Sequence, residues 1–320
     1  MQKSITVFLF FLLGIGVPSI ALAQACCSAG TPLLSSLELP STSAGTLQFA
    51  LTYEYNTLRD VLSASSTLND DSRRRATHSL LLETSYGFSS SFSASVLLTI
   101  VQQERSIRSS FDGGESFLKT RGVGDAIVLL KYNLIRANIL NQLDVSIGAG
   151  AKIPLGRSNL TTDSILLPAD MQPGTGAWDG ILWGYVSQGF VPTLPLNVFA
   201  SASYRYTGSN ARFGNNQESY TFGNELVANL GVGFRTDKEL DFSLVLRFRQ
   251  TTSDRFAAAA IPNTGGQWLS AVPGVNVKVL DNLAVRASGQ IPVYRNLEGT
   301  QLTTSYTASV TLFYTLSMLE

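Results

Sequence analysis

Apolar and polar residues alternate with a period of two along most of the chain. In residues 46–56 the apolar positions are Leu47, Phe49, Leu51, Tyr53 and Tyr55. Successive side chains of a β-strand point to opposite faces, so this pattern predicts a strand with one apolar face. Further strands are predicted at 76–88, 92–100, 122–134, 143–153, 178–190, 197–206, 225–235, 240–249, 267–279, 283–294 and 306–314. The alternation is less regular in 76–88, 122–134, 178–190 and 267–279.

The connections between these segments alternate between long and short. Long connections are predicted at 57–75, 105–121, 155–175, 208–219, 253–265 and 296–301, and short ones at 89–91, 136–141, 191–195, 236–239 and 281–282. Outer-membrane barrels have short periplasmic turns and long external loops. We therefore predict an all-β fold, a transmembrane antiparallel up-and-down β-barrel over residues 46–320, with about 12 strands and with 10 or 14 as alternatives.

The composition separates this fold from a soluble β-sandwich, whose strands also alternate. Charged residues make up 14% of the chain, whereas soluble domains average about 25%. The polar faces of the predicted strands are mostly Ser, Thr, Asn and Gly, while a sandwich charges its solvent face densely. No apolar run beyond Val17 approaches the length of a membrane-spanning helix. The barrel is therefore favoured.

The first residues have the pattern of a signal peptide. Lys3 is followed by an apolar run over residues 5–17 and by small residues up to Ala25. We predict a cleaved signal peptide over residues 1–25 and delivery to the bacterial outer membrane. Cys26 and Cys27 are the only cysteines. Lipid attachment to Cys26 is a minor alternative, because the residues before it match a lipoprotein cleavage site poorly.

Residues 26–45 do not alternate, and Glu38 is their only charged residue. This segment is predicted to lie in the periplasm or to plug the barrel, with a disordered leader as a further alternative. In the loop 155–175, Ile165, Leu166 and Leu167 form an apolar stretch. This loop could fold inward or present an apolar entry site.

The polar faces of the predicted strands carry charges of both signs. An arginine on the lipid face near the bilayer midplane costs roughly 2–4 kcal/mol, so these charges are expected to face the lumen. The predicted pore-lining residues are Glu83, Asp125, Lys131, Asp144, Lys152, Arg205, Glu225, Arg235, Arg247, Arg249 and Arg286, with Glu54 on the same face. They predict either a selectivity lining for polar or anionic solutes or an interior filled by ion pairs.

Other function classes have little support in the sequence. His78 is the only histidine, and it has neither a Ser-x-x-His spacing nor a metal-ligand spacing around it. We therefore expect an interfacial histidine rather than the general base of a hydrolase. The cysteine pattern supports no metal site, and no glycine loop indicates a cofactor. A formal net charge of zero offers no basic footprint for nucleic acid. The expected partners are outer-membrane lipid and a small-molecule solute; the oligomeric state is open.

Several short segments from Gly122 onward resemble a known family. They are Val123-Gly124-Asp125 with Leu130-Lys131-Tyr132, Gly150-Ala151-Lys152-Ile153-Pro154-Leu155-Gly156, Leu167-Pro168 before Gln172-Pro173-Gly174-Thr175-Gly176, Tyr204-Arg205-Tyr206, Tyr220-Thr221-Phe222-Gly223, Gly265-Gly266 with Val272-Pro273-Gly274, and Pro292-Val293-Tyr294 with Gly299-Thr300-Gln301-Leu302. In order and spacing they resemble the outer-membrane family called "MetA-pathway of phenol degradation", which is akin to hydrocarbon and fatty-acid channels. The region before Gly122 shows no match.

The resemblance implies a barrel that passes small aromatic or hydrophobic compounds, without settling the solute or supplying binding residues. We therefore predict a channel or transporter for passive uptake or efflux of small, aromatic or hydrophobic solutes. The alternative is a structural or surface-interaction barrel that conducts nothing.

Overall fold

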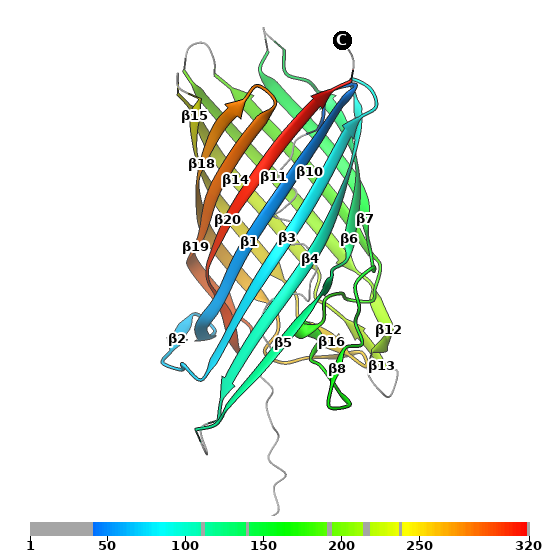
Figure 1. Ribbon diagram of the computed structural model, residues 1–320, viewed down its shortest axis with the longest axis vertical. Coiled ribbons are helices and arrows are strands. Elements are labelled where there is room, and N and C mark those ends of the chain that lie inside the picture. The colour runs from blue at the N-terminus through cyan, green and yellow to red at the C-terminus, as the bar shows by residue number, and fades with distance from the viewer. Residues whose placement is uncertain are drawn as a thin grey trace, which may run out of the picture.

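The chain folds into a closed antiparallel β-barrel, as predicted (Figure 1). The computed structural model describes residues 41–109, 113–138, 141–190, 194–213, 218–236 and 239–318. The predicted signal peptide, Cys26 and most of the segment 26–45 lie outside these residues. Among the described residues, no helix has the length and apolar character needed to span a bilayer.

The barrel wall has twelve strands, because β5 and β6 form two halves of one strand and β2 (Ser66–Leu68) only extends a loop. The wall consists, in order, of β1 (Thr46–Ser63), β3 (Arg73–Gly87), β4 (Phe92–Arg108), β5 (Glu115–Val123) with β6 (Ala126–Ile135), β7 (Leu143–Ile153), β10 (Asp179–Gly189), β11 (Leu196–Thr207), β14 (Glu225–Arg235), β15 (Leu240–Thr251), β18 (Gly266–Leu280), β19 (Leu283–Leu297) and β20 (Thr300–Ser317). β20 pairs with β1 along its length, with Leu51 opposite Leu312, so the barrel has no open edge.

The long connections lie at one end of the barrel and carry small elements of their own (Figure 1). β12 (Ser209–Phe213), β13 (Glu218–Thr221), β16 (Arg255–Phe256) and β17 (Ala259–Ala260) form a four-stranded sheet. β8 (Thr161–Thr162), β9 (Ile165–Leu166) and the 3-10 helix η2 (Ala169–Met171) belong to the connection between β7 and β10. We call this end the loop end and the other the turn end.

One predicted long connection is wrong. The chain reverses between Leu297 and Thr300 through a tight turn instead of a loop over 296–301. Gly299 has a φ of +76°, which a glycine adopts without strain. β1, β3 and β4 also run further into the loop end than predicted, because strand pairing continues beyond the point where the outer face loses its apolar residues.

Aromatic side chains mark two levels on the outer surface. At the turn end, the rings of Phe92 and Tyr132 lie 4.8 Å apart, and at the loop end those of Tyr55 and His78 lie 5.1 Å apart. On β3, His78 and Tyr86 are eight residues apart, which corresponds to about 26 Å along a strand. Because barrel strands are tilted by about 35–45°, this corresponds to a height of about 20 Å, somewhat less than the apolar band of about 25 Å between two aromatic girdles.

Candidate functional site: the barrel lumen

The predicted pore-lining residues alternate in sequence with exposed apolar residues of the outer face, which places them on the inner side of the wall. Glu83, Asp125, Lys131, Lys152, Arg205 and Glu225 are buried; Asp144, Arg247, Arg249 and Arg286 are partly buried; and Arg235 is exposed. Arg235 borders a cavity of about 540 Å³ at the turn end, together with Asp241 and Lys278. A role in lining an open pore stays a prediction for all of them.

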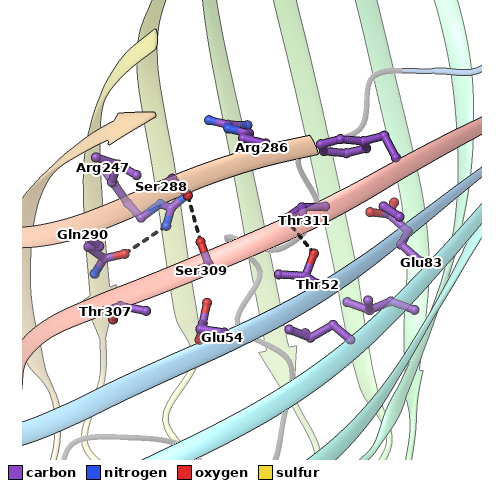
Figure 2. Close-up of a pocket in the computed structure, with 15 residues that line it drawn as sticks. Thr52, Glu54, Glu83, Arg247, Arg286, Ser288, Gln290, Thr307, Ser309 and Thr311 are labelled. Atoms are coloured by element: carbon purple, nitrogen blue, oxygen red, sulfur yellow. Dashed lines mark hydrogen bonds between the residues drawn. The ribbon is translucent and has the colours of Figure 1, made fainter. Parts of the chain in front are cut away.

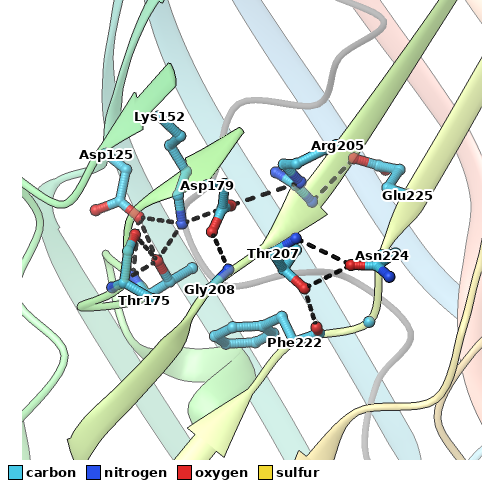
Figure 3. Close-up of polar contacts among 12 residues, drawn as sticks. Asp125, Lys152, Thr175, Asp179, Arg205, Thr207, Gly208, Phe222, Asn224 and Glu225 are labelled. Carbon is cyan, nitrogen blue, oxygen red and sulfur yellow. Dashed lines mark hydrogen bonds and ion pairs between the residues drawn. The ribbon is translucent and has the colours of Figure 1, made fainter. Parts of the chain in front are cut away.

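Near the loop end, alternating charges follow one another across neighbouring strands (Figure 3). Lys152 Nζ lies 3.1 Å from Asp125 Oδ2 and 2.9 Å from Asp179 Oδ2. Arg205 continues the series, with Nε 3.8 Å from Asp179 Oδ2 and Nη2 2.9 Å from Glu225 Oε2. The strand register causes this arrangement, because Asp179 pairs with Lys152 and Arg205 pairs with Glu225.

The series ends at Arg249, whose Nε lies 2.6 Å from Glu225 Oε1 and whose guanidinium lies 4.9 Å from the centre of the Trp268 ring. We call Asp125, Lys152, Asp179, Arg205, Glu225 and Arg249 the charge ladder. Its positive and negative groups are equal in number, so the ladder is neutral as a whole. The sequence did not predict Asp179 as a pore-lining residue, because it lies at the start of the irregular segment 178–190.

The connection between β7 and β10 folds into the loop end of the barrel and is held there by the charge ladder. Asp125 Oδ1 accepts a hydrogen bond from the Gly156 amide at 3.1 Å. Asp125 Oδ2 accepts bonds from the Thr175 amide at 3.0 Å and from its hydroxyl at 2.7 Å. The apolar residues of the predicted loop 155–175 therefore have different environments. Met171 is fully buried, whereas Ile165 is 71% exposed.

A second set of contacts fastens the same loop to the neighbouring strands β3, β4 and β5. Arg75 of β3 and Asp170 form an ion pair of 3.1 Å with almost no exposure. Gln103 of β4 donates to the Gln172 carbonyl at 3.2 Å, and Thr120 of β5 donates to the Met171 carbonyl at 2.9 Å. These contacts hold the loop in the loop-end mouth against β3, β4 and β5. We call residues 155–178 the inserted loop.

Below the inserted loop, one side of the lumen is apolar, which the sequence did not lead us to expect. A cluster of buried side chains projects inward from five strands: Leu81, Leu97, Ile127, Leu129, Ile181, Trp183 and Val227, with Tyr185 packed against it. We call it the apolar wall. Its signal in the sequence is the loss of alternation, since β3, β6 and β10 have apolar residues on both faces, as in Leu80-Leu81-Leu82.

The apolar wall includes one buried charge, Lys131. Its Nζ lies 4.9 Å from the centre of the Trp183 ring and 3.9 Å from Glu83 Oε1. Gly148 lies between Lys131 and Trp183 in the strand register. A Cβ at Gly148 would approach the Trp183 ring to 3.3 Å and the Lys131 side chain to 3.4 Å. The missing side chain therefore leaves room for the ammonium to approach the indole.

The facing side of the lumen is polar and borders an interior cavity (Figure 2). Most of the polar lining comes from β1, β15, β19 and β20: Thr52, Glu54, Arg247, Arg286, Ser288, Gln290, Thr307, Ser309 and Thr311; Glu83 of β3 also borders the cavity. Arg247 Nη1 donates to Gln290 Oε1 at 2.9 Å, and the hydroxyls of Ser288 and Ser309 lie 2.8 Å apart. Leu81 and Leu97 of the apolar wall border the same cavity, so it has one apolar and one polar side.

The residues just before β1 lie against the inner wall at the turn end. The Thr42 hydroxyl lies 2.6 Å from that of Ser85, and the Ser41 hydroxyl lies 3.3 Å from that of Ser146. The Gly45 amide donates to the Gly87 carbonyl at 2.8 Å. The chain therefore enters β1 from inside the barrel.

His78 lies on the outer face of β3, where the Tyr53 hydroxyl is 2.8 Å from its Nδ1. Its neighbours Tyr53 and Tyr55 are aromatic, and it takes no part in the lumen. Among the residues that the structure describes, no group of three His, Cys, Asp or Glu side chains is placed to hold a metal ion.

No family model and no curated protein matches the chain. Membership of the family that the sequence resembles therefore stays a prediction. The chain is similar in structure to the COG4313 outer membrane channel from Pseudomonas putida F1, with a TM-score of 0.67 and 12% identity over 87% of this chain and 98% of that one. This protein has the fold of an outer-membrane channel.

Two further structures match less well. The Ralstonia pickettii toluene transporter TbuX has a TM-score of 0.44 and 9% identity over 93% of this chain and 98% of that one. The transport unit of the Escherichia coli autotransporter AIDA-I has a TM-score of 0.49 and 9% identity over 87% of this chain and 94% of that one. At these TM-scores the two structures give no indication of the function of this chain.

Proposed function

We propose that this protein is an outer-membrane channel for passive movement of small apolar or aromatic solutes. The observation that carries the proposal is the apolar wall. Porin lumens are polar because water fills them, whereas sites for small organic molecules are mainly apolar with a few polar groups. A lumen with one apolar and one polar side fits a solute with an apolar body better than it fits ions.

The compartment belongs to the same proposal. The fold shared with a solved outer-membrane channel and the two aromatic levels support the outer membrane. The signal peptide over residues 1–25 would deliver the chain there. We further propose that residues 26–45 plug the lumen, which is supported by the contacts of Ser41 and Thr42 with the inner wall.

Polar substitutions in the apolar wall test the transport role. We expect Leu129→Ser with Ile181→Ser to lower uptake of a small aromatic solute into proteoliposomes several-fold, because the solute loses its apolar contacts. Both side chains face the lumen, so the introduced serine hydroxyls are not exposed to lipid. The control is Thr307→Ala, which lies on the polar side of the interior cavity and should leave aromatic uptake unchanged.

The alternative, a barrel that conducts nothing, makes a different prediction for the same preparation. In that case the wild-type protein would show neither aromatic uptake nor single-channel conductance in planar bilayers, and the apolar wall would serve only as packing. Equal uptake by the wild-type protein and the double variant would contradict the role given to the apolar wall.

A further inference from the structure

The outer face of the barrel has a group of basic side chains at the loop end of β1, β3 and β5. Arg59, Arg74, Lys119 and Arg121 are all exposed, and we call them the basic patch. Their position is set by register: Arg121 pairs with Gln102, which pairs with His78, while Lys119 pairs with Glu104. The patch therefore spans neighbouring strands of one wall.

Among the residues that the structure describes, the arginines of the basic patch form no ion pair. Lys119 Nζ lies 2.8 Å from Glu104 Oε1, but among the described residues no carboxylate lies within 4.0 Å of the guanidinium of Arg59, Arg74 or Arg121. Leu58 and Arg75 form the last pair between β1 and β3, and Arg59 and Arg74 follow directly on the loop side of that pair. Neighbouring like charges repel one another, and a bound anion would offset this repulsion.

The basic patch lies at the height where a membrane presents its headgroups. Arg121 is in the same cross-strand row as His78 and Tyr55, which belong to the loop-end aromatic level. Arg74 is four residues beyond His78, about 13 Å further along the strand. Aromatic belts mark the interface between hydrocarbon and headgroups, so groups just beyond them meet the headgroups.

The wall formed by β15, β18 and β19 shows that this charge is local. There, Phe248 and Tyr294 lie on the outer face near the loop end. The next outward-facing residues toward the loop end are Gln250, Gln267 and Asn296, which pair across β15, β18 and β19. These three side chains are uncharged. Positive charge at this height is therefore a feature of the β1–β5 wall rather than of the whole rim.

We propose that the basic patch binds a phosphorylated glycolipid of the outer leaflet, a lipid whose sugar headgroup carries phosphate esters. Guanidinium groups suit this ligand because their planar array of donors binds phosphate oxygens in pairs. The lipid chains would lie along the apolar outer face below, with the phosphates between Arg59, Arg74 and Arg121. The proposal rests on the outer-membrane placement and is independent of any solute in the lumen.

The test measures binding of diphosphorylated lipid A to the purified barrel in detergent by native mass spectrometry, with dephosphorylated lipid A as the comparison. We expect the wild-type protein to retain the diphosphorylated lipid and lose the dephosphorylated one. R59Q/R74Q/R121Q should weaken binding roughly tenfold to hundredfold, since each basic residue near an anionic surface contributes about a fivefold factor. The control R157Q/R212Q/R255Q removes equal charge from exposed loop positions and should bind as the wild type does.

A single variant keeps the proposal testable if the triple variant folds poorly. Arg74→Gln removes one charge from an exposed position, so it should fold, and it should reduce the rise in unfolding temperature that added lipid A gives the wild type. Equal retention of the two lipids by the wild type, or equal weakening by the loop control, would overturn the proposal. Aromatic uptake through the lumen should be the same in all these variants, so failure here is distinct from failure of the channel role.

Discussion

At the residue scale, the main feature of the lumen is that nearly all of its charges have partners. Burying a charge is costly unless an opposite charge and hydrogen bonds compensate it. The charge ladder achieves this by placing each of its four inner ions between two of opposite sign, as Lys152 lies between Asp125 and Asp179. The individual charges and their inward direction could be predicted from alternation within one strand. Which charges form ion pairs with one another could not be predicted, because that depends on the register between strands.

Lys152→Met tests the energetic role of the ladder. The substitution keeps the side chain's length but leaves Asp125 and Asp179 buried without their shared cation. We expect the free energy of unfolding to fall by about 3–5 kcal/mol, the range for removing one partner of a buried ion pair. Urea unfolding in detergent measures this loss.

Lys278→Met is the control for that measurement. Lys278 forms an ion pair of 2.6 Å with Asp281, but both side chains are well exposed. Exposed pairs contribute little to stability, so unfolding should not change measurably. A Lys152 variant as stable as the wild type would show that the ladder does not stabilise the barrel.

At the scale of elements, the strands with irregular alternation carry the apolar wall. Segments 76–88, 122–134 and 178–190 became β3, β5 with β6, and β10, each with apolar side chains on both faces. A strand that faces lipid on one side and an apolar lumen on the other has no reason to alternate. Irregularity was thus the available signal for most of the apolar wall, while Leu97 and Val227 come from the regular strands β4 and β14. Its meaning depended on knowing that β3, β6 and β10 lie in one part of the wall, separated only by β4 and β7.

The inserted loop is the element whose position the sequence left open. Asp170→Asn should loosen it, because Arg75 then loses the carboxylate that holds η2 against β3. We expect amide hydrogen exchange over residues 165–177 to rise several-fold, and single-channel conductance to increase as the loop-end mouth opens. Hydrogen exchange followed by mass spectrometry measures the first effect.

Asp163→Asn provides the comparison within the same loop. Asp163 is exposed at the tip between β8 and β9, so its loss of charge should alter neither exchange nor conductance. If exchange over residues 165–177 stayed at the wild-type rate in the Asp170 variant, the ion pair with Arg75 would not be what retains the loop.

At the scale of the whole molecule, the barrel separates two environments with one layer of strand. Neighbouring residues of β20 show this: Val310 is 51% exposed on the outer face, whereas Ser309 lines the interior cavity. The outer face must be apolar along its length because hydrocarbon cannot hydrate a charge, while the inner face can hold polar and apolar groups together.

A pair of arginine substitutions at these two positions tests the closed barrel in lipid. Val310→Arg should destabilise the folded protein by about 2–4 kcal/mol, the cost of an arginine on the lipid face near the midplane. Ser309→Arg should cost clearly less, because its guanidinium enters the cavity near Glu54. Urea titration in lipid vesicles, followed by the slower gel migration of unfolded barrels, compares them. An equal loss in both variants would contradict the assignment of the faces.

The sequence alone predicted the fold class, about twelve wall segments and an inward face for most of the charges, although not for Asp179. These follow from a period of two that each strand shows by itself. Tertiary structure decided which inward residues meet: the charge ladder, the contact of Lys131 with Trp183, and the insertion of residues 155–178 into the mouth. Such contacts join residues of different strands and loops, and they depend on register and closure, which no local period encodes.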